Sequence, residues 1–260
     1  MNSNPRNRRR MALRRLSCPA RFIVLLLAAG AAGAWAAQTT GDNPAGRLAA
    51  SDPGPSPTLG ALPPMIDDKT IVLFDGTSWE GWRQADGQPS QWEIQDDGSV
   101  RVKGGNALTN IQLTDCQLHL EFLCPLMEGR TGQGRANSGV YLHGRYEVQV
   151  LDSFGDEPAI DRCGAIYSIA PPLVAVSRPP DTWQTYDIIF RAPRFDGAGT
   201  MTAPAYMTVL HNGVVVHNHQ EVAHTTTAAM DSKMVPAGPL LLQDHGCPVR
   251  YRNIWLRKLD

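Results

Sequence analysis

A carboxylate and an amide stand two residues apart in segment 145–151, where the sequence RYEVQVL alternates polar and apolar residues. This alternation predicts a β-strand with one buried face. Glu147 and Gln149 would share the other face, with Cα atoms about 7 Å apart. Both could contact one small polar ligand, with Glu147 as a catalytic base and Gln149 as a binding residue. The alternative is a polar row that faces solvent on an outer strand.

His245 is a second candidate for proton transfer. It lies in the run QDHG at 243–246, directly after the apolar segment 238–243. Histidine is the residue type that titrates near neutral pH, and the neighbouring glycine favours a loop that presents its ring. The alternative is a ring that only bonds loop carbonyls. The sequence does not decide whether Glu147 or His245 is the base, and Gln243 is a candidate binding residue beside them.

Three further polar residues are candidates for the same site. Arg252 would offer a planar cation to a developing negative charge, as a third catalytic residue, although pairing with a carboxylate across strands is an equal alternative. Asp152 follows the strand 145–151 on the face opposite Glu147, so a bulge or turn would have to redirect it. Asn137 could bond ligand hydroxyls, or it could serve the turn chemistry of an Asn-Ser-Gly run.

Two tyrosines complete the candidate binding residues. Tyr141 shares a face with Asn137 in the alternating segment 137–143, and Tyr167 lies in segment 164–168. Tyr167 could stack on a ring-shaped ligand, but a large aromatic side chain in a β-sandwich more often packs in the core.

Metal ligands are weakly indicated. His217 and His219 would share a strand face, but two ligands are weak support for a metal, and we interpret the pair as a polar row at a sheet edge. A divalent metal ion held by carboxylates and His245 could still act as an electrophile. No certain cofactor follows from the sequence.

The elements that must position these residues are short and rich in β-branched and aromatic residues. We expect strands at 71–74, 91–95, 99–103, 117–123, 138–142, 145–151, 164–168, 184–191, 205–210, 214–217, 238–243 and 249–258. Asp97-Gly98 and Asn212-Gly213 separate alternating runs and predict hairpins. The pattern predicts an all-β fold, a two-sheet antiparallel sandwich of the jelly-roll type.

The first 64 residues differ in composition from the rest. Residues 1–36 join an arginine-rich start, an apolar run at 22–33 and Ala34-Trp35-Ala36, the order of a signal peptide that is cleaved after export to the periplasm or the outside. A retained anchor is less favoured because the apolar run is shorter than the roughly 20 residues of a membrane span. Residues 37–64 are rich in Pro, Gly, Ala and Ser and predict a flexible tether before a folded domain at 65–260.

Charge narrows the choice of partners. Seven arginines and no acidic residue lie within 1–36, so the remainder carries 17 basic and 25 acidic residues. An acidic protein lacks the basic surface that nucleic acids and anionic lipids need. We therefore expect no nucleic-acid partner. We also expect no stable membrane span.

Four cysteines lie in the predicted domain, at 116, 124, 163 and 247. Cys116 and Cys124 bracket a predicted strand, so their Cα atoms would lie about 27 Å apart. A disulfide between them is excluded, because its Cα atoms must lie within about 7 Å of each other. A bridge from one of them to Cys163 or Cys247 and buried free thiols are equal alternatives.

Several runs in order resemble the 3-keto-disaccharide hydrolase family, formerly a domain of unknown function, which has a concanavalin-A-like jelly-roll fold. The runs are LFDG at 73–76, GW at 81–82, NSGVY at 137–141, YEVQVLD at 146–152, GAIY at 164–167, WQTYD at 183–187, NG at 212–213, LQDHG at 242–246 and RNI at 252–254. The resemblance covers roughly residues 70–260.

The resemblance implies a carbohydrate substrate whose C3 hydroxyl a separate glycoside 3-dehydrogenase has oxidised to a ketone. The ketone acidifies the C2 proton, so a base can form an enolate that expels the aglycone from C1, and water then adds back. This route needs a base, an electrophile for the enolate oxygen and an acid for the leaving group.

Two other functions stay open on the same fold. One is a carbohydrate-binding module without catalysis, because the fold alone does not decide activity. The other is an ordinary glycosidase, which places carboxyl groups about 5–5.5 Å apart for retention. The same-face positions after Glu147 are Gln149 and Leu151, which disfavours a mechanism with two carboxylates.

Overall fold

The computed structural model describes residues 67–259 of the chain. The predicted leader at 1–36 and tether at 37–64 lie outside the described residues. Within 67–259, no helix is both long and apolar enough to span a membrane. All of the described residues lie within the predicted domain at 65–260, whose boundaries stay a prediction.

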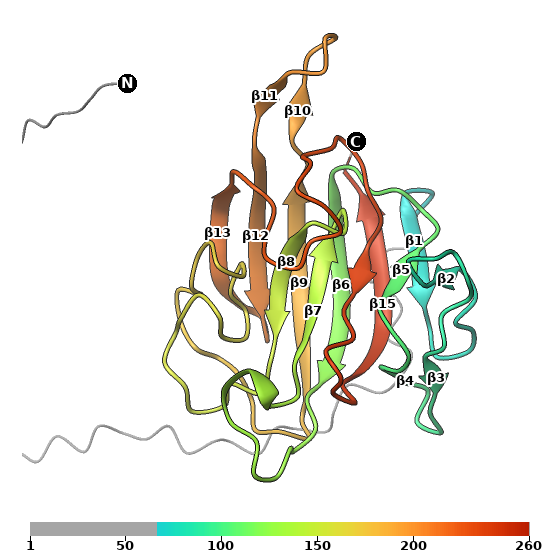
Figure 1. Ribbon diagram of the computed structural model, residues 1–260, viewed down its shortest axis with the longest axis vertical. Coiled ribbons are helices and arrows are strands. Elements are labelled where there is room, and N and C mark those ends of the chain that lie inside the picture. Colours follow the sequence, from blue (N-terminus) through green and yellow to red (C-terminus); the bar gives the residue numbers. More distant parts are fainter. Residues whose placement is uncertain (1–66, 260) are drawn as a thin grey trace, which may run out of the picture. The chain divides into compact units, whose positions relative to one another are not determined.

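The larger of two facing sheets has the strand order β13-β12-β9-β6-β15-β4-β3, and β1 pairs with β15 (Figure 1). All of its pairings are antiparallel. Its strands are β1 (Thr70–Phe74), β3 (Glu93–Ile94), β4 (Val100–Arg101), β6 (Cys116–Leu123), β9 (Trp183–Arg191), β12 (Ala205–His211), β13 (Val214–Val222) and β15 (Arg250–Lys258).

The smaller sheet has the order β2-β5-β14-β7-β8 and is also antiparallel. Its strands are β2 (Trp82–Arg83), β5 (Ala107–Thr109), β14 (Leu241–Leu242), β7 (Ser138–Leu142) and β8 (Tyr146–Val150). A separate ribbon pairs β10 (Arg194–Phe195) with β11 (Met201–Ala203), and η1 (Gly132–Gly134) is a single 3-10 turn. The predicted all-β, two-sheet antiparallel sandwich of the jelly-roll type is thus confirmed.

Alternation along β7 and β8 decides which side chains enter the core. Val140, Val148 and Val150 are fully buried in the main hydrophobic cluster, together with Ile188 and Phe190 of the facing sheet. The other face of the same two strands carries the polar residues. The parity read from the sequence is therefore confirmed, and it leaves a polar row on the outer face of the smaller sheet.

Both predicted hairpins are present. Asp97-Gly98 joins β3 to β4, and Asn212-Gly213 joins β12 to β13. Asn212 and Gly213 have φ values of 52° and 79°, the left-handed conformation that favours these two residue types in a tight turn.

The expected strand at 164–168 is wrong. Ile166 forms only isolated bridges, to Val148 and to Ala170, because the chain folds back at Ser168, whose φ is 61°. The short strands β2, β5, β10 and β11 were not expected, since two or three residues are too few to show an alternation.

The cysteines match the alternative of buried thiols. Cys124, Cys163 and Cys247 are buried and free, and Cys116 is buried as well. The Cys163 sulfur lies 3.1 Å from the Tyr186 hydroxyl in the core.

Candidate active site

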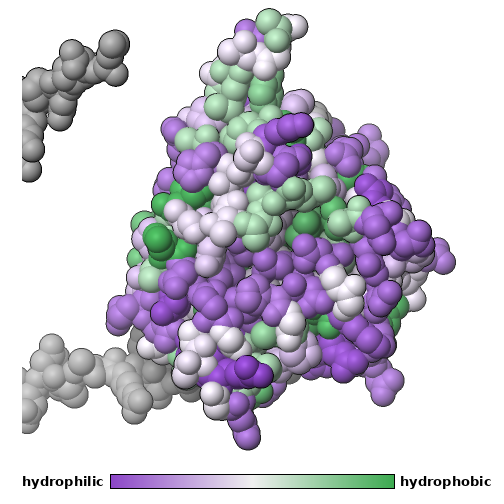
Figure 2. All heavy atoms as spheres, viewed as in Figure 1, coloured by the Kyte–Doolittle hydropathy of each residue, from purple (hydrophilic) through white to green (hydrophobic). Residues whose placement is uncertain are grey.

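A cavity of about 100 Å³ opens on the outer face of β7 and β8. It brings Glu147 and His245 together, and five of the predicted binding residues line it as well. The lining residues are Gln133, Asn137, Tyr141, Glu147, Gln149, Tyr167, Thr227, Ala228, Gln243 and His245. Figure 2 shows a broad band of hydrophilic residues on the face of the molecule drawn in Figure 1.

The pairing of β7 with β8 determines how the site is assembled. Tyr141 lies opposite Glu147, and Gly139 lies opposite Gln149. A Cβ atom on Gly139 would come within 2.3 Å of Glu147 Oε1 and 2.8 Å of Tyr141 Cε2. The absence of a side chain at Gly139 therefore creates the space that the Glu147 carboxylate occupies.

Loops close the free edge of β8 and hold Glu147 in place. The Glu147 amide donates to Thr226 Oγ1 at 3.0 Å, and the Tyr167 amide donates to the Glu147 carbonyl at 3.1 Å. The segment that was expected to be a strand thus serves as an edge cover. It also places Tyr167 in the cavity wall.

Glu147 is a buried carboxylate with 3% of its surface exposed. Burial raises its pKa from 4.5 to about 8, because the cavity disfavours the charged form, while a hydrogen bond from the Tyr141 hydroxyl acts in the opposite direction. A carboxylate with a pKa near neutral is suited to removing a weakly acidic proton and returning it.

Tyr141 and Gln243 form a polar pair beside this carboxylate. Gln243 Nε2 donates to the Tyr141 hydroxyl at 3.0 Å. Burial, with the charge of Glu147 as the next cause, raises the pKa of Tyr141 well above its ordinary value. Tyr141 therefore keeps its proton at neutral pH and remains a hydrogen-bond donor.

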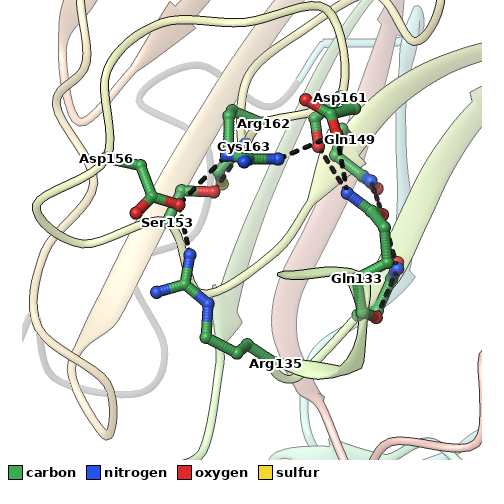
Figure 3. A network of polar contacts seen from close by, with 9 residues as sticks. Gln133, Arg135, Gln149, Ser153, Asp156, Asp161, Arg162 and Cys163 are labelled. Atoms are coloured by element: carbon green, nitrogen blue, oxygen red, sulfur yellow. Dashed lines mark hydrogen bonds and ion pairs between the residues drawn. The ribbon is translucent and has the colours of Figure 1, made fainter. Parts of the chain in front are cut away.

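Gln133, which the sequence analysis missed, connects two of the predicted residues. Its Oε1 accepts from Asn137 Nδ2 at 2.9 Å and from Gln149 Nε2 at 3.0 Å, and its Nε2 donates to the Asp161 carbonyl at 2.9 Å (Figure 3). Gln133 stands between two glycines in η1, and this loop composition was the only available signal. Thr227 and Ala228 had no sequence signal at all.

His245 is exposed at the rim of the cavity. Its loop is shaped by Asp244, whose Oδ1 accepts from the Gly246 amide and whose Oδ2 accepts from the Gly105 amide, both at 2.8 Å. Gly246 has a φ of 75°, a conformation that glycine adopts without strain.

Arg252 requires a correction, because it lies on β15 of the other sheet and does not line the cavity. Its Nε is 2.7 Å from Glu121 Oε2, and both side chains are buried. The guanidinium also lies over the Trp183 ring at 4.1 Å. The alternative of a cross-strand ion pair is the one that the structure contains.

Asp152 also lies outside the cavity lining. It is buried, and its Oδ1 accepts a hydrogen bond from the Phe154 amide at 3.3 Å, while its own amide donates to the Arg135 carbonyl. No bulge redirects it toward Glu147, so its parity keeps it away from the site.

No group of three or more His, Cys, Asp and Glu side chains within 67–259 is arranged to hold a metal ion, and we assign no metal ligand. The expectation that His217 and His219 form a solvent-facing polar row is wrong for His217. His217 is buried with its Nε2 2.8 Å from the Gly164 carbonyl, whereas His219 is exposed and stacks on Tyr206.

A larger, open hollow of about 480 Å³ lies beside β2 and contains Trp79, Trp82 and Trp92 in its wall. The Trp79 ring stacks between the other two, at centroid distances of 4.3 and 5.5 Å. Both faces of the Trp79 ring are therefore covered by other rings. The buried carboxylate at Glu147 makes the smaller cavity the better candidate for an active site.

Similarity to solved structures agrees with the fold. The chain is 36% identical to a candidate glycosyl hydrolase from Parabacteroides distasonis ATCC 8503, with a TM-score of 0.68 over 74% of this chain and 84% of the other. A second structure described in the same way, from the same organism, is 20% identical, with a TM-score of 0.57 over 74% of this chain and 94% of the other, and shows the fold alone.

Sequence comparison gives the family. No curated protein matches the chain. The profile of the 3-keto-alpha-glucoside-1,2-lyase-like domain matches residues 69–257, which is nearly the whole of the described part. The chain therefore belongs to the 3-keto-alpha-glucoside-1,2-lyase-like domain family.

Proposed function

We propose that this domain cleaves glycosides whose sugar carries a ketone at C3, by removal of the C2 proton, elimination of the aglycone and addition of water. The observation that carries the proposal is a single buried carboxylate, Glu147, with a pKa of about 8 in a cavity lined by amides and tyrosines. Membership of the family and the similarity to candidate glycosyl hydrolases support the same class of substrate.

Glu147 is the base in this proposal. Its carboxylate takes the C2 proton, and the electron pair of that bond forms the enolate with the C3 carbonyl. The enolate then expels the aglycone oxygen from C1, which leaves a double bond between C1 and C2. Water adds to C1 and gives a proton to His245, which has lost one to the aglycone oxygen. Glu147 returns its proton to C2, so the net reaction is hydrolysis.

The neighbouring residues have distinct tasks in this scheme. Tyr141, which keeps its proton, can donate it to the Glu147 carboxylate or to the Thr227 carbonyl, 3.3 Å away, and so helps to position the carboxylate. His245 at the rim protonates the departing oxygen, where the leaving group has access to solvent. Asn137, Gln149 and Gln243 bind sugar hydroxyls, and Tyr167 contacts the sugar ring.

The cavity argues against the two other functions. Among the described residues that line it, Glu147 is the only carboxylate, whereas an ordinary glycosidase needs two. The raised pKa of Glu147 favours catalysis over binding alone, because a carboxyl group that titrates near neutral pH is suited to proton transfer.

Proton exchange at C2 is the direct test. Incubation of a 3-keto-glucoside in heavy water with the enzyme should incorporate deuterium at C2 and release the aglycone, and the unoxidised glucoside should be inert. Glu147→Gln should abolish both exchange and release. Release from the unoxidised glucoside at an equal rate, or release without exchange at C2, would contradict the proposal.

The reaction needs a supply of oxidised substrate. We propose that a separate dehydrogenase that oxidises the C3 hydroxyl of glycosides provides it, and that the protein is exported through the leader predicted at 1–36. The acidic charge of the remaining chain disfavours nucleic acids and anionic membrane surfaces as partners.

A further inference from the structure

We infer that Gln133 is a positioning residue: its amide, oriented by Asp161, turns the Gln149 amide so that the cavity presents hydrogen-bond acceptors to hydroxyl groups of the substrate. The inference rests on the proposed function, because it describes how the same cavity selects its sugar.

The orientation begins at Asp161. Its main-chain carbonyl can only accept, so the atom of Gln133 that lies 2.9 Å away must be the NH₂ group. The Asp161 carboxylate lies 3.4 Å from the same nitrogen and favours the same orientation. The Gln133 oxygen therefore faces the other way, toward the cavity wall.

The Gln133 oxygen then orients two more amides. It accepts from Asn137 Nδ2 at 2.9 Å and from Gln149 Nε2 at 3.0 Å, which uses both lone pairs of one carbonyl oxygen. Asn137 is held in the same orientation by a second bond, from its Nδ2 to the Gln133 main-chain carbonyl at 3.0 Å. The oxygen atoms of Asn137 and Gln149 are thus turned away from Gln133.

Gln149 shows the consequence for a ligand. The side chain is 1% exposed, it lines the cavity, and its Oε1 is a buried acceptor with no partner in the described part of the protein. Gln243 Oε1 is also a buried acceptor without a partner in the described residues, while Gln243 Nε2 donates to the Tyr141 hydroxyl. Buried acceptors without a donor are unfavourable, and a sugar hydroxyl in the cavity would supply one.

Asp161 lies at one end of an ion-pair network, but its main-chain carbonyl, which orients Gln133, takes no part in the ion pairs. Arg162 Nη1 lies 2.8 Å from Asp161 Oδ2, and Arg162 Nε lies 3.0 Å from Asp156 Oδ2, which also pairs with Arg135 (Figure 3). Asp156 does not contact Gln133 in this network. It therefore offers a matched control that disturbs the loop without touching the amides.

The test compares hydroxyl and fluorine at C4 and C6 of a 3-keto-glucoside, because fluorine cannot donate a hydrogen bond. The wild-type enzyme should prefer the hydroxyl compound in kcat/KM by about tenfold or more at one of these positions, as expected where a buried acceptor loses its donor. Gln133→Met, which removes the amide but keeps the side-chain length, should reduce this preference to about threefold or less.

Two further variants separate positioning from a general loss of structure. Asp156→Asn should lower thermal stability but keep the wild-type preference for hydroxyl over fluorine. On a Gln149→Met background, Gln133→Met should have little further effect on that preference. An unchanged preference in Gln133→Met, or an equal reduction in Asp156→Asn, would overturn the inference.

A readout without turnover keeps this inference separate from the proposed function. In the free wild-type protein, the side-chain NH₂ protons of Asn137 and Gln149 should exchange slowly with solvent by NMR, and in Gln133→Met they should exchange at least about tenfold faster. If the wild-type protein cleaves no 3-keto-glycoside, the proposed function fails while this measurement still tests the orientation. Unchanged exchange in Gln133→Met would overturn the orientation itself.

Discussion

At the scale of single residues, the site depends on one buried carboxylate, that of Glu147. Glu147 lies between Tyr141 and the space above Gly139, and its raised pKa follows from that burial. A base of this kind is useful only if its position is tight, because errors on the order of 1 Å in a catalytic group cost about 100-fold in rate. The surrounding atoms therefore matter as much as the carboxylate.

Gly139→Ala tests this dependence on space. The added methyl group would come within 2.3 Å of Glu147 Oε1, so the carboxylate must move. We expect kcat/KM to fall by about 100-fold or more with a single cooperative unfolding transition retained. Val140→Ala, on the core face of β7, is a control for a change in the same strand, because Val140 does not line the cavity. Full activity in Gly139→Ala would contradict the placement of Glu147.

The pH dependence of the reaction should report the Glu147 carboxyl. The base is active when ionised, so kcat/KM should rise with pH and level off above about pH 8. A rate that is already constant from about pH 5 upward would show that a group with an ordinary carboxyl pKa is the base.

Glu147→Gln should stabilise the protein at alkaline pH. The folded pKa lies above the unfolded value of 4.5, so the stability of the wild-type protein decreases as pH rises through about 8. A neutral amide avoids this loss. We expect Tm to rise by several degrees relative to the wild type at about pH 9, with a much smaller difference at about pH 5. Equal differences at both pH values would contradict the raised pKa.

At the scale of elements, β8 is an edge strand whose free side is covered by loops rather than by another strand. Thr226 bonds the Glu147 amide, and the segment around Ala165 exchanges backbone hydrogen bonds with Gln149. An uncovered edge would expose the backbone of the residues that carry the chemistry. The cover satisfies that backbone and supplies Tyr167, Thr227 and Ala228 to the cavity.

Arg252 on β15 belongs to this scale, because it stabilises the large sheet. Arg252→Met leaves Glu121 buried beside Asn253 without its cation, and we expect a loss of about 3–5 kcal/mol in the free energy of unfolding. At temperatures where the Arg252→Met variant is folded, its kcat/KM should stay within about threefold of the wild type, since Arg252 does not line the cavity.

Denaturant unfolding and steady-state kinetics on the same preparation check both statements. The double variant Arg252→Met, Glu121→Met removes both charges and should recover much of the lost stability. A large fall in kcat/KM at unchanged stability would instead assign Arg252 to the reaction.

At the scale of the whole molecule, two buried histidines, His211 and His143, make the stability of the fold depend on pH in acid. Burial lowers the pKa of His211 to about 3 and that of His143 to about 4. A histidine with a lowered pKa contributes stability above its unfolded value of 6.5, and this contribution is lost as pH falls toward the folded value. Glu147 acts in the opposite direction, so stability should be greatest near neutral or slightly acidic pH.

His211→Gln tests the acid side of this profile. His211 Nε2 lies 2.8 Å from Gln184 Oε1, and a glutamine can offer a donor in its place. Between pH 7 and about pH 4.5, the variant should lose on the order of 2 kcal/mol less unfolding free energy than the wild type. Denaturant unfolding at both pH values measures the difference. Parallel losses in the two proteins would show that His211 titrates normally.

The sequence by itself determined the features that depend on local periodicity and turn chemistry. Alternation in 145–151 placed Glu147 and Gln149 on one face of their strand, and alternation in 137–143 did the same for Asn137 and Tyr141. The two hairpins followed from Asp97-Gly98 and Asn212-Gly213. These features were predictable because a strand has a period of two and a tight turn needs particular residues. Four of the ten residues that line the cavity, Asn137, Tyr141, Glu147 and Gln149, lie in these two segments.

Only the tertiary structure decided which sheet each polar row belongs to. Arg252 and Glu147 both alternate on strands, but β15 and β8 lie in different sheets, and local periodicity carries no information on long-range pairing. The same holds for Gln133 and Ala228, which reach the cavity through loops with no period, and for the pKa of Glu147, which burial sets. Contacts between segments far apart in the chain determine these properties, because desolvation and side-chain packing arise only when the sheets and loops close around the site.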